Sequence, residues 1–251
     1  MISLIYAAQL SNTLNSLLEN VILLFGLGFI FAAATINTKT NLKLKQAFFG
    51  LILGGVIYII MLNPFVLEEG LIFDTRSVLL SVTGLFFGGI TTGIAATVAI
   101  TYRIILGGTG VYAGVLTITS SAMIGLNWKC IRRILPKMPT YLEFYIMGVM
   151  VHVVTLLSFL AIPWPQAFEV IENTALVYLL IFPVVTMLLA IVVYHEKARL
   201  QTNQELENQK VSQKIRSFFA EWAQNYNFQR IFYSIHRYYF LDSNIPPRKI
   251  L

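Results

Sequence analysis

Long apolar runs separated by short basic loops constrain this chain more than any other feature. A helix that crosses a bilayer needs about 20 mostly apolar residues. Such runs lie near residues 14–35, 46–63, 77–89, 91–106, 111–128, 141–162 and 174–195. The chain is 57% hydrophobic and only 12% charged, whereas soluble domains have about 25% charged residues. The sequence therefore predicts an all-α integral membrane protein, a bundle of about six to seven transmembrane helices followed by a cytoplasmic helix.

The third and fourth runs form one stretch, residues 77–106, which glycines interrupt at Gly88, Gly89 and Gly93. Cytoplasmic loops of membrane proteins carry an excess of Lys and Arg. Basic residues cluster in three segments, 39–45, 129–137 and 197–199. These segments share one side only if the stretch crosses the membrane and returns, either as two short tilted spans or as a broken re-entrant hairpin. We therefore predict a multi-pass cell-membrane protein with its N-terminus outside and its C-terminus in the cytoplasm.

Two arginines lie within this apolar region. Arg76 opens the third run and Arg103 lies near the end of the fourth, so the predicted topology puts both toward the outer face. An arginine at membrane depth is costly, and its presence is by default a hypothesis about function. A guanidinium matches a carboxylate or phosphate with two parallel hydrogen bonds, so the pair predicts a clamp for a small anion. The alternative is architecture, an intramembrane ion network of Asp74 with both arginines.

Five further residues complete the predicted ligand site. Gly107, Gly108 and Gly110 would let backbone N–H groups approach an anion closely, and the helix that follows adds the positive partial charge of its N-terminus. Thr117 would supply a hydroxyl from that helix, and Asp74 would orient or neutralise an arginine in the empty site. The alternative role for the glycines is close helix packing. No catalytic group, metal or cofactor is predicted.

An ordered series of motifs surrounds these residues. It consists of Asp74-x-Arg76 within Gly70–Arg76, the paired Gly88-Gly89 within Gly84–Gly93, Tyr102-Arg103, Gly107-Gly108-Thr109-Gly110, Gly114 and Gly125-Leu126. The series resembles the 5TM receptor region of the LytS–YhcK type, over residues 12–195. The resemblance implies the membrane input module of bacterial LytS-like sensor histidine kinases or of some diguanylate cyclases. It also implies two-component control of murein metabolism or of small-metabolite responses, and a functional role for Arg76 and Arg103.

The composition changes after Tyr194. The segment that follows predicts a helix to about Trp222, whose apolar stripe favours either a coiled-coil dimer or a helix lying on the membrane. The aromatic and basic tail from Tyr226 is either the start of a truncated output domain or a segment on anionic lipid. No glycine follows Gly148, and the phosphate-binding loops of kinases and cyclases need glycine. We therefore expect that this chain is not an enzyme by itself.

The leading hypothesis is a membrane sensor domain, residues 1–195, that binds a small anion near the outer face and relays this to a cytoplasmic segment, residues 196–251. The expected partners are the anionic ligand, the lipid bilayer and either a second copy of the chain or a signalling protein. Nucleic acid is not expected, because the basic residues follow the positive-inside pattern. The alternatives are a small-anion transporter, which a second broken helix pair would support, and a truncated sensor without output.

Overall fold

The computed structural model describes residues 42–62, 65–68, 71–73, 75–225, 234 and 237. The first predicted span, residues 14–35, lies outside the described residues, as does almost all of the tail that begins at Tyr226. The chain divides into two compact units, Met1–Ala198 and Arg199–Leu251.

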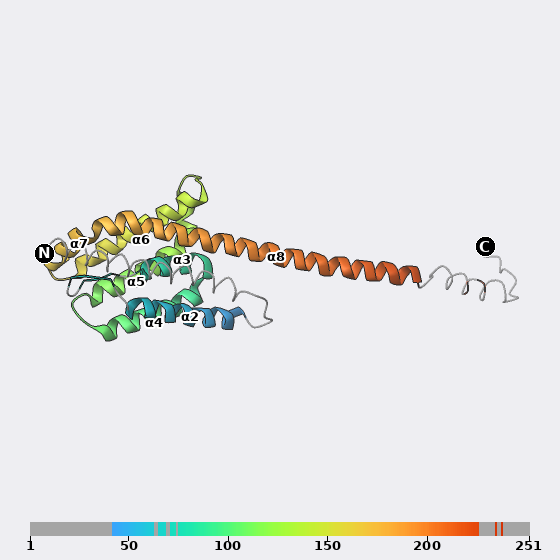
Figure 1. Cartoon of the computed structure of the whole chain (residues 1–251), viewed down its shortest axis with the longest axis horizontal. Helices are drawn as coiled ribbons and strands as arrows, with labels where there is room; N and C mark the ends of the chain where they lie inside the picture. The colour runs from blue at the N-terminus through green and yellow to red at the C-terminus, as the bar shows by residue number, and fades with distance from the viewer. Residues whose placement is uncertain are drawn as a thin grey trace, which may run out of the picture. The chain divides into compact units, whose positions relative to one another are not determined.

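The described part of the first unit is built almost entirely of helices (Figure 1). In chain order the elements are α2 (Leu42–Leu62), an antiparallel hairpin of β1 (Phe65–Glu68) and β2 (Leu71–Phe73), α3 (Arg76–Phe87), α4 (Gly89–Leu106), α5 (Val111–Ile131), a 3-10 turn (Arg132–Ile134), α6 (Thr140–Ser158), a second 3-10 turn (Phe159–Ala161), α7 (Gln166–Leu176), a π-helical turn (Val177–Ile181) and α8 (Phe182–Asn225). The predicted all-α membrane bundle is confirmed, with the small hairpin as an addition that the apolar pattern did not indicate.

Four of the described helical segments are long and apolar enough to cross a membrane. They are Leu42–Leu62, Gly89–Leu106, Thr140–Ala161 and the continuous segment that starts at Gln166. α3 differs, because its 12 residues extend only about 18 Å, well short of the roughly 30 Å of a hydrocarbon core. The two short apolar runs are therefore unequal: α4 is long enough to cross, and α3 is not.

Gly88 is the point at which the stretch breaks. Its φ of 82° is in the left-handed region that glycine adopts without strain, and α3 ends on one side of it while α4 begins on the other. The second break, predicted at Gly93, is wrong, since Gly93 lies inside α4 and its carbonyl accepts a hydrogen bond of 2.8 Å from the Thr97 hydroxyl. One glycine in a helix costs about 1 kcal/mol relative to alanine, which is too little to end a helix that packs along its neighbour.

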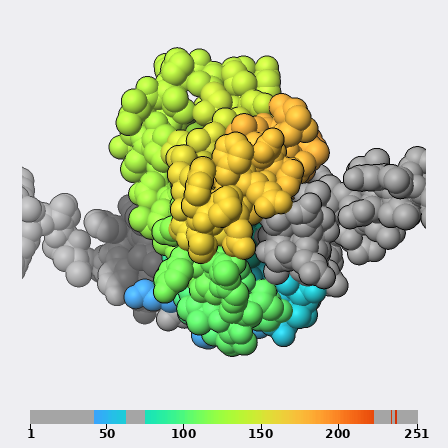
Figure 2. All heavy atoms as spheres, turned by 90° about the vertical axis from the view of Figure 1, so that its left-hand side faces the viewer, coloured from blue at the N-terminus to red at the C-terminus, as the bar shows by residue number. Residues whose placement is uncertain are grey.

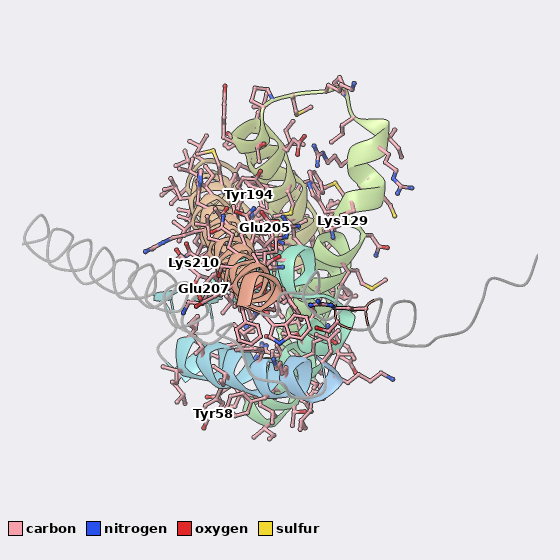
Figure 3. The ribbon with its side chains drawn as sticks, turned by 90° about the vertical axis from the view of Figure 1, so that its right-hand side faces the viewer. Tyr58, Lys129, Tyr194, Glu205, Glu207 and Lys210 are labelled. Carbon is pink, nitrogen blue, oxygen red and sulfur yellow. The ribbon has the colours of Figure 1, made fainter. Side chains whose placement is uncertain are left out.

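α2 and α4 lie side by side and run in the same direction (Figure 1). Near the start of both helices, the Thr91 hydroxyl donates a hydrogen bond of 3.0 Å to the Gln46 carbonyl. Near their far ends, the rings of Tyr58 and Tyr102 meet edge to face, with centroids 4.7 Å apart. Figure 3 shows Tyr58 at the periphery of the helices, on the side of α2. Because α3 connects to α4 through a reversal at Gly88, α3 runs in the opposite direction.

α3 and α5 cross at a point where both helices carry small residues. A Cβ built on Gly125 would collide with the backbone of Ser81, and one built on Gly84 would lie 2.7 Å from the Leu126 nitrogen and 2.9 Å from the Ala122 oxygen. Small residues let helix backbones approach this closely inside a bilayer. This crossing sets the position of α3 along the axis of α5.

The two ends of the bundle carry different basic residues. At the end where α2 and α4 begin, Lys197 of α8 donates a hydrogen bond to the Phe86 carbonyl in the last turn of α3. This is named the lysine end, and its lysines include Lys43, Lys45, Lys129 and Lys197. The opposite end holds Arg103 and the turn 107–110 between α4 and α5. This is named the arginine end, and Figure 2 looks onto it, with the α4–α5 turn in green.

We expect Lys197→Met to destabilise the bundle by about 1–2 kcal/mol. The last carbonyls of a helix have no partner within it, and Lys197 serves one of them while its Nζ lies 5.4 Å from the ring centre of Phe87. The measurement is the melting temperature (Tm) of the detergent-solubilised chain. Lys210→Met is the control, because Lys210 is exposed and pairs with Glu207 of its own helix, at 3.3 Å (Figure 3). Equal losses from both substitutions would contradict the capping role.

Candidate functional site

Arg103 lies in the last turn of α4 and folds over the first turn of α5. Its Nη1 donates a hydrogen bond of 3.1 Å to the Gly107 carbonyl. A Cβ built on Gly114 would lie 2.5 Å from Arg103 Nε, and one built on Gly110 would lie 2.9 Å from Nη2. Only 9% of Arg103 is exposed. The guanidinium therefore occupies space that exists because both positions are glycine.

The turn between α4 and α5 is tight. Gly107 and Gly108 have φ of 69° and 85°, a region that favours glycine. The Gly107 N–H donates to the Ile104 carbonyl at 3.2 Å, and the Val111 N–H donates to the Gly108 carbonyl at 3.3 Å. Backbone conformation alone thus accounts for Gly107 and Gly108, while Gly110 leaves room for Arg103.

Thr117 lies on the same face of α5 as Gly110 and Gly114, because residues three and four apart share a helix face. It is 3% exposed, and its hydroxyl has no hydrogen-bond partner among the described residues. The hydroxyls of Thr119 and Ser121 differ, since each donates to a carbonyl one turn earlier in the same helix. Thr117 therefore holds a buried polar group in line with Arg103.

Arg76 is the first residue of α3 and is 8% exposed. Thr75 precedes it and is fully buried. The side chain of Thr75 makes no capping hydrogen bond, and its hydroxyl has no partner among the described residues. The crossing at Gly84 and Gly125 places the start of α3 about 10 Å deeper than the start of α5, at a rise of about 1.5 Å per residue. The N-terminus of α3 consequently lies inside the bundle, at about the depth of Thr117.

Part of the predicted ligand set converges in the structure. Arg103, Gly107 and Gly110 meet at the start of α5, and Thr117 lies about two turns further along. Arg76 belongs to the same half of the bundle but lies deeper than Arg103, because the short helix α3 begins inside it. Gly108 is exposed in the turn. Asp74 lies outside the described residues.

Two residues beyond the predicted set belong to the candidate site. Gly114 makes room for the Arg103 side chain, and its position four residues after Gly110 was a signal that it shares a helix face with Gly110. Thr75 presents a buried hydroxyl beside Arg76, and no spacing pattern in the sequence singles it out. Among the described residues, no cluster of His, Cys, Asp or Glu is suited to holding a metal ion.

A comparison with known proteins places the chain in a family. The model of the family described as 5TMR of 5TMR-LYT matches residues 28–195. The chain belongs to this family. The resemblance inferred from the ordered glycine and arginine motifs is therefore confirmed, and the 5TMR-LYT match contains every residue of the candidate site. A 5TMR-LYT domain is a transmembrane sensor region and not a catalytic one. No curated protein and no solved structure matches the chain.

Proposed function

We propose that this 5TMR-LYT domain is a membrane sensor that binds a small anion at the arginine end of its bundle. One observation carries the proposal. The Arg103 guanidinium is held over the first turn of α5, on the face that also carries the unpartnered, buried hydroxyl of Thr117. Arg76 and the buried start of α3 add a second cationic group in the same half of the bundle.

Electrostatics favours an anion between these groups. The N-terminus of a helix carries about half an elementary positive charge, and Arg103 adds a full charge beside the N-terminus of α5. Arg103 Nη1 also donates a hydrogen bond of 3.1 Å to the Gly107 carbonyl. Carboxylates and phosphates match both guanidinium geometry and helix N-termini. The same argument applies to Arg76 at the start of α3, where burial strengthens the attraction.

The buried hydroxyls add a second requirement. A buried polar group without a partner costs about 1–3 kcal/mol, and Thr75 and Thr117 each hold such a group. A ligand oxygen that reached them would remove this cost. The proposed ligand is therefore a small molecule whose carboxylate or phosphate group faces the arginines and whose other polar atoms reach the hydroxyls.

The distribution of lysines supports an orientation in which the arginine end faces the outside of the cell membrane. Lys43, Lys45, Lys129 and Lys197 gather at the opposite end. Cytoplasmic loops hold such an excess of basic residues. In this orientation the N-terminus is outside, the C-terminus is cytoplasmic, and the ligand arrives from outside.

The output of the proposed sensor leaves through α8. This helix is continuous from Phe182 to Asn225. Its second half exposes apolar side chains at the spacing of a coiled-coil seam, namely Val211, Ile215, Phe218 and Trp222, which suits a second copy of the chain or a partner signalling protein. The LytS-type motifs favour the input region of a two-component sensor kinase, with cell-wall or small-metabolite responses as its output. The chain itself would sense and relay without catalysis.

Thermal unfolding of the full chain in detergent tests the ligand site. An anion that binds only the folded state raises the Tm with concentration, and stabilisation reaches about 2.7 kcal/mol at 100 times the Kd. We expect at least one of acetate, succinate and inorganic phosphate to raise the Tm of the wild type. We expect Arg76→Ala combined with Arg103→Ala to abolish that rise.

Arg133→Ala provides the matched control, because Arg133 is exposed beyond the end of α5. It removes a positive charge without touching the arginine end, and it should keep the Tm rise. Two outcomes would contradict the proposal. One is a wild type that none of the anions stabilises, and the other is a double variant that is stabilised as much as the wild type.

Anion transport is a second candidate function. It is favoured by α3, a short helix that begins inside the bundle, since transporters direct the N-termini of broken helices at anionic substrates. Uptake of a radiolabelled stabilising anion into proteoliposomes separates the two functions. Accumulation that depends on Arg76 and Arg103 would support transport, whereas binding without flux would support a sensor.

A further inference from the structure

His152 is buried at the centre of the bundle, with 0% exposure, and both of its ring nitrogens have polar neighbours. Nδ1 lies 2.7 Å from the Gly148 carbonyl oxygen. A carbonyl oxygen can only accept, so Nδ1 carries the hydrogen, and the neutral ring presents Nε2 as an acceptor. The Ser77 hydroxyl, at 3.3 Å, donates to that atom. His152 on α6 is thereby bonded to the first turn of α3, one residue after Arg76.

The ring of His152 also packs against the start of α8. Its centroid lies 5.8 Å from that of Tyr178 and 5.2 Å from that of Phe182. Tyr178 belongs to the π-helical turn Val177–Ile181, and Phe182 is the first residue of α8. The same imidazole therefore contacts the residue beside Arg76 and the segment that leads into the output helix.

The π-helical turn is the irregular helical element in this contact. Pro183 has no N–H and cannot complete an α-helical bond to the carbonyl four residues earlier, which explains why the backbone widens just before it. Single π-turns inside α-helices are rare and often occur at functional sites. Because a π-turn holds more residues than an α-turn, conversion between them changes the rotational register of the helix that follows.

We infer that His152 is a positioning residue that couples the arginine site to the π-helical turn at the root of α8. This inference rests on the proposed function. An anion that binds Arg76 shifts the adjacent Ser77. This shift changes the hydrogen bond from the Ser77 hydroxyl to His152 Nε2. The imidazole is held on its other side by the Gly148 carbonyl and by Tyr178, so the displacement reaches the π-turn. A ligand can shift such an equilibrium only through its different affinity for the two states.

A nitroxide spin label at Leu180→Cys reads out the π-turn in the full chain, with Cys130→Ser as background. Leu180 is 58% exposed and lies in the turn. The reference label is at Leu157→Cys, also 58% exposed but on α6. We expect Ser77→Ala and His152→Phe to change the spectrum at Leu180 without ligand. Loss of one hydrogen bond would raise the population of the alternative state about fivefold. The spectrum at Leu157 should stay unchanged.

Thr155→Val is the matched control substitution. Thr155 is fully buried three residues from His152, and its hydroxyl donates only within α6, to the Val151 carbonyl at 3.0 Å. It should leave the Leu180 spectrum as in the wild type. The inference is overturned if Ser77→Ala leaves that spectrum unchanged, or if Thr155→Val alters it equally. Ser77→Ala removes a single oxygen, so the test holds even where His152→Phe does not fold.

Measuring both the Tm and the Leu180 spectrum distinguishes this inference from the proposed function. Both are measured with acetate, succinate and inorganic phosphate. An anion that raises the Tm should also shift the Leu180 spectrum, and Ser77→Ala should retain the Tm rise while losing the shift. A Tm rise without any spectral change in the wild type overturns the coupling and leaves the ligand site intact. A Leu180 spectrum that responds to Ser77→Ala, with no anion raising the Tm, upholds the mechanical link and overturns the proposed ligand.

Discussion

Gly125→Ala is expected to lower the Tm of the detergent-solubilised chain by about 5–10 °C, given a cost of about 1–3 kcal/mol for overpacking and a few degrees per kcal/mol. A Cβ at this position would collide with the backbone of Ser81 on α3. A flexible side chain can turn away from an added methyl group, but a helix backbone cannot. The two helices must therefore separate, and the contacts on either side of the crossing weaken with them.

Gly93→Ala provides the comparison for this substitution. It adds the same methyl group to a glycine inside α4, where no described residue lies within 4 Å of the Cβ position. Alanine has the higher helix propensity, so this variant should be as stable as the wild type or slightly more stable. If the two variants had the same Tm, the α3–α5 crossing would not be the tight contact that the structure describes.

Gly114→Ala is expected to weaken anion binding about as strongly as Arg103→Ala, by about 10- to 100-fold, which corresponds to losing one charge-assisted hydrogen bond. A Cβ here would lie 2.5 Å from Arg103 Nε and 2.9 Å from Cδ. The arginine would leave the first turn of α5 while keeping its charge. The substitution thus tests whether binding needs the guanidinium in this position, because the arginine itself is still present.

The measurement is the concentration of a stabilising anion that gives half of the maximal Tm rise. Gly55→Ala controls for an added methyl group far from the arginines, since this glycine of α2 has no neighbour within 4 Å of its Cβ position in the described part of the chain. If Gly114→Ala bound the anion as tightly as the wild type, the observed position of Arg103 would be irrelevant to binding. Arg103 would then act only through its long-range charge.

The membrane bundle follows from patterns that operate over short stretches of chain. Apolar runs of bilayer length have to be helical, because only intrahelical bonds satisfy the backbone in lipid. The predicted spans near 46–63, 91–106 and 141–162 correspond to α2, α4 and α6. The final predicted span, 174–195, lies within a longer helical run that begins at Gln166, since amphipathic α7 continues into it and composition marks only its apolar part.

Part of the candidate site could be predicted from the sequence. Arg76 and Arg103 stand out because charge is rare in apolar runs. The difference in depth between the two arginines could not be predicted from the sequence, because it depends on where α3 and α5 cross, at Gly84 and Gly125. Thr117 was predicted on helix position alone. That its hydroxyl lacks a partner, while Ser121 is bonded within its own helix, depends on rotamers that packing selects.

By itself, the sequence determined the all-α membrane class, the glycine turn at Gly88 and the grouping of lysines at the end of the bundle opposite Arg103. Each of these follows from local chemistry: hydrocarbon length, a left-handed φ, and the charges of loops. Only the tertiary structure decided that Arg103 rests on α5 and that His152 joins α3 to the root of α8. These contacts join residues far apart in the chain, and they exist only where close helix packing brings the side chains within bonding distance.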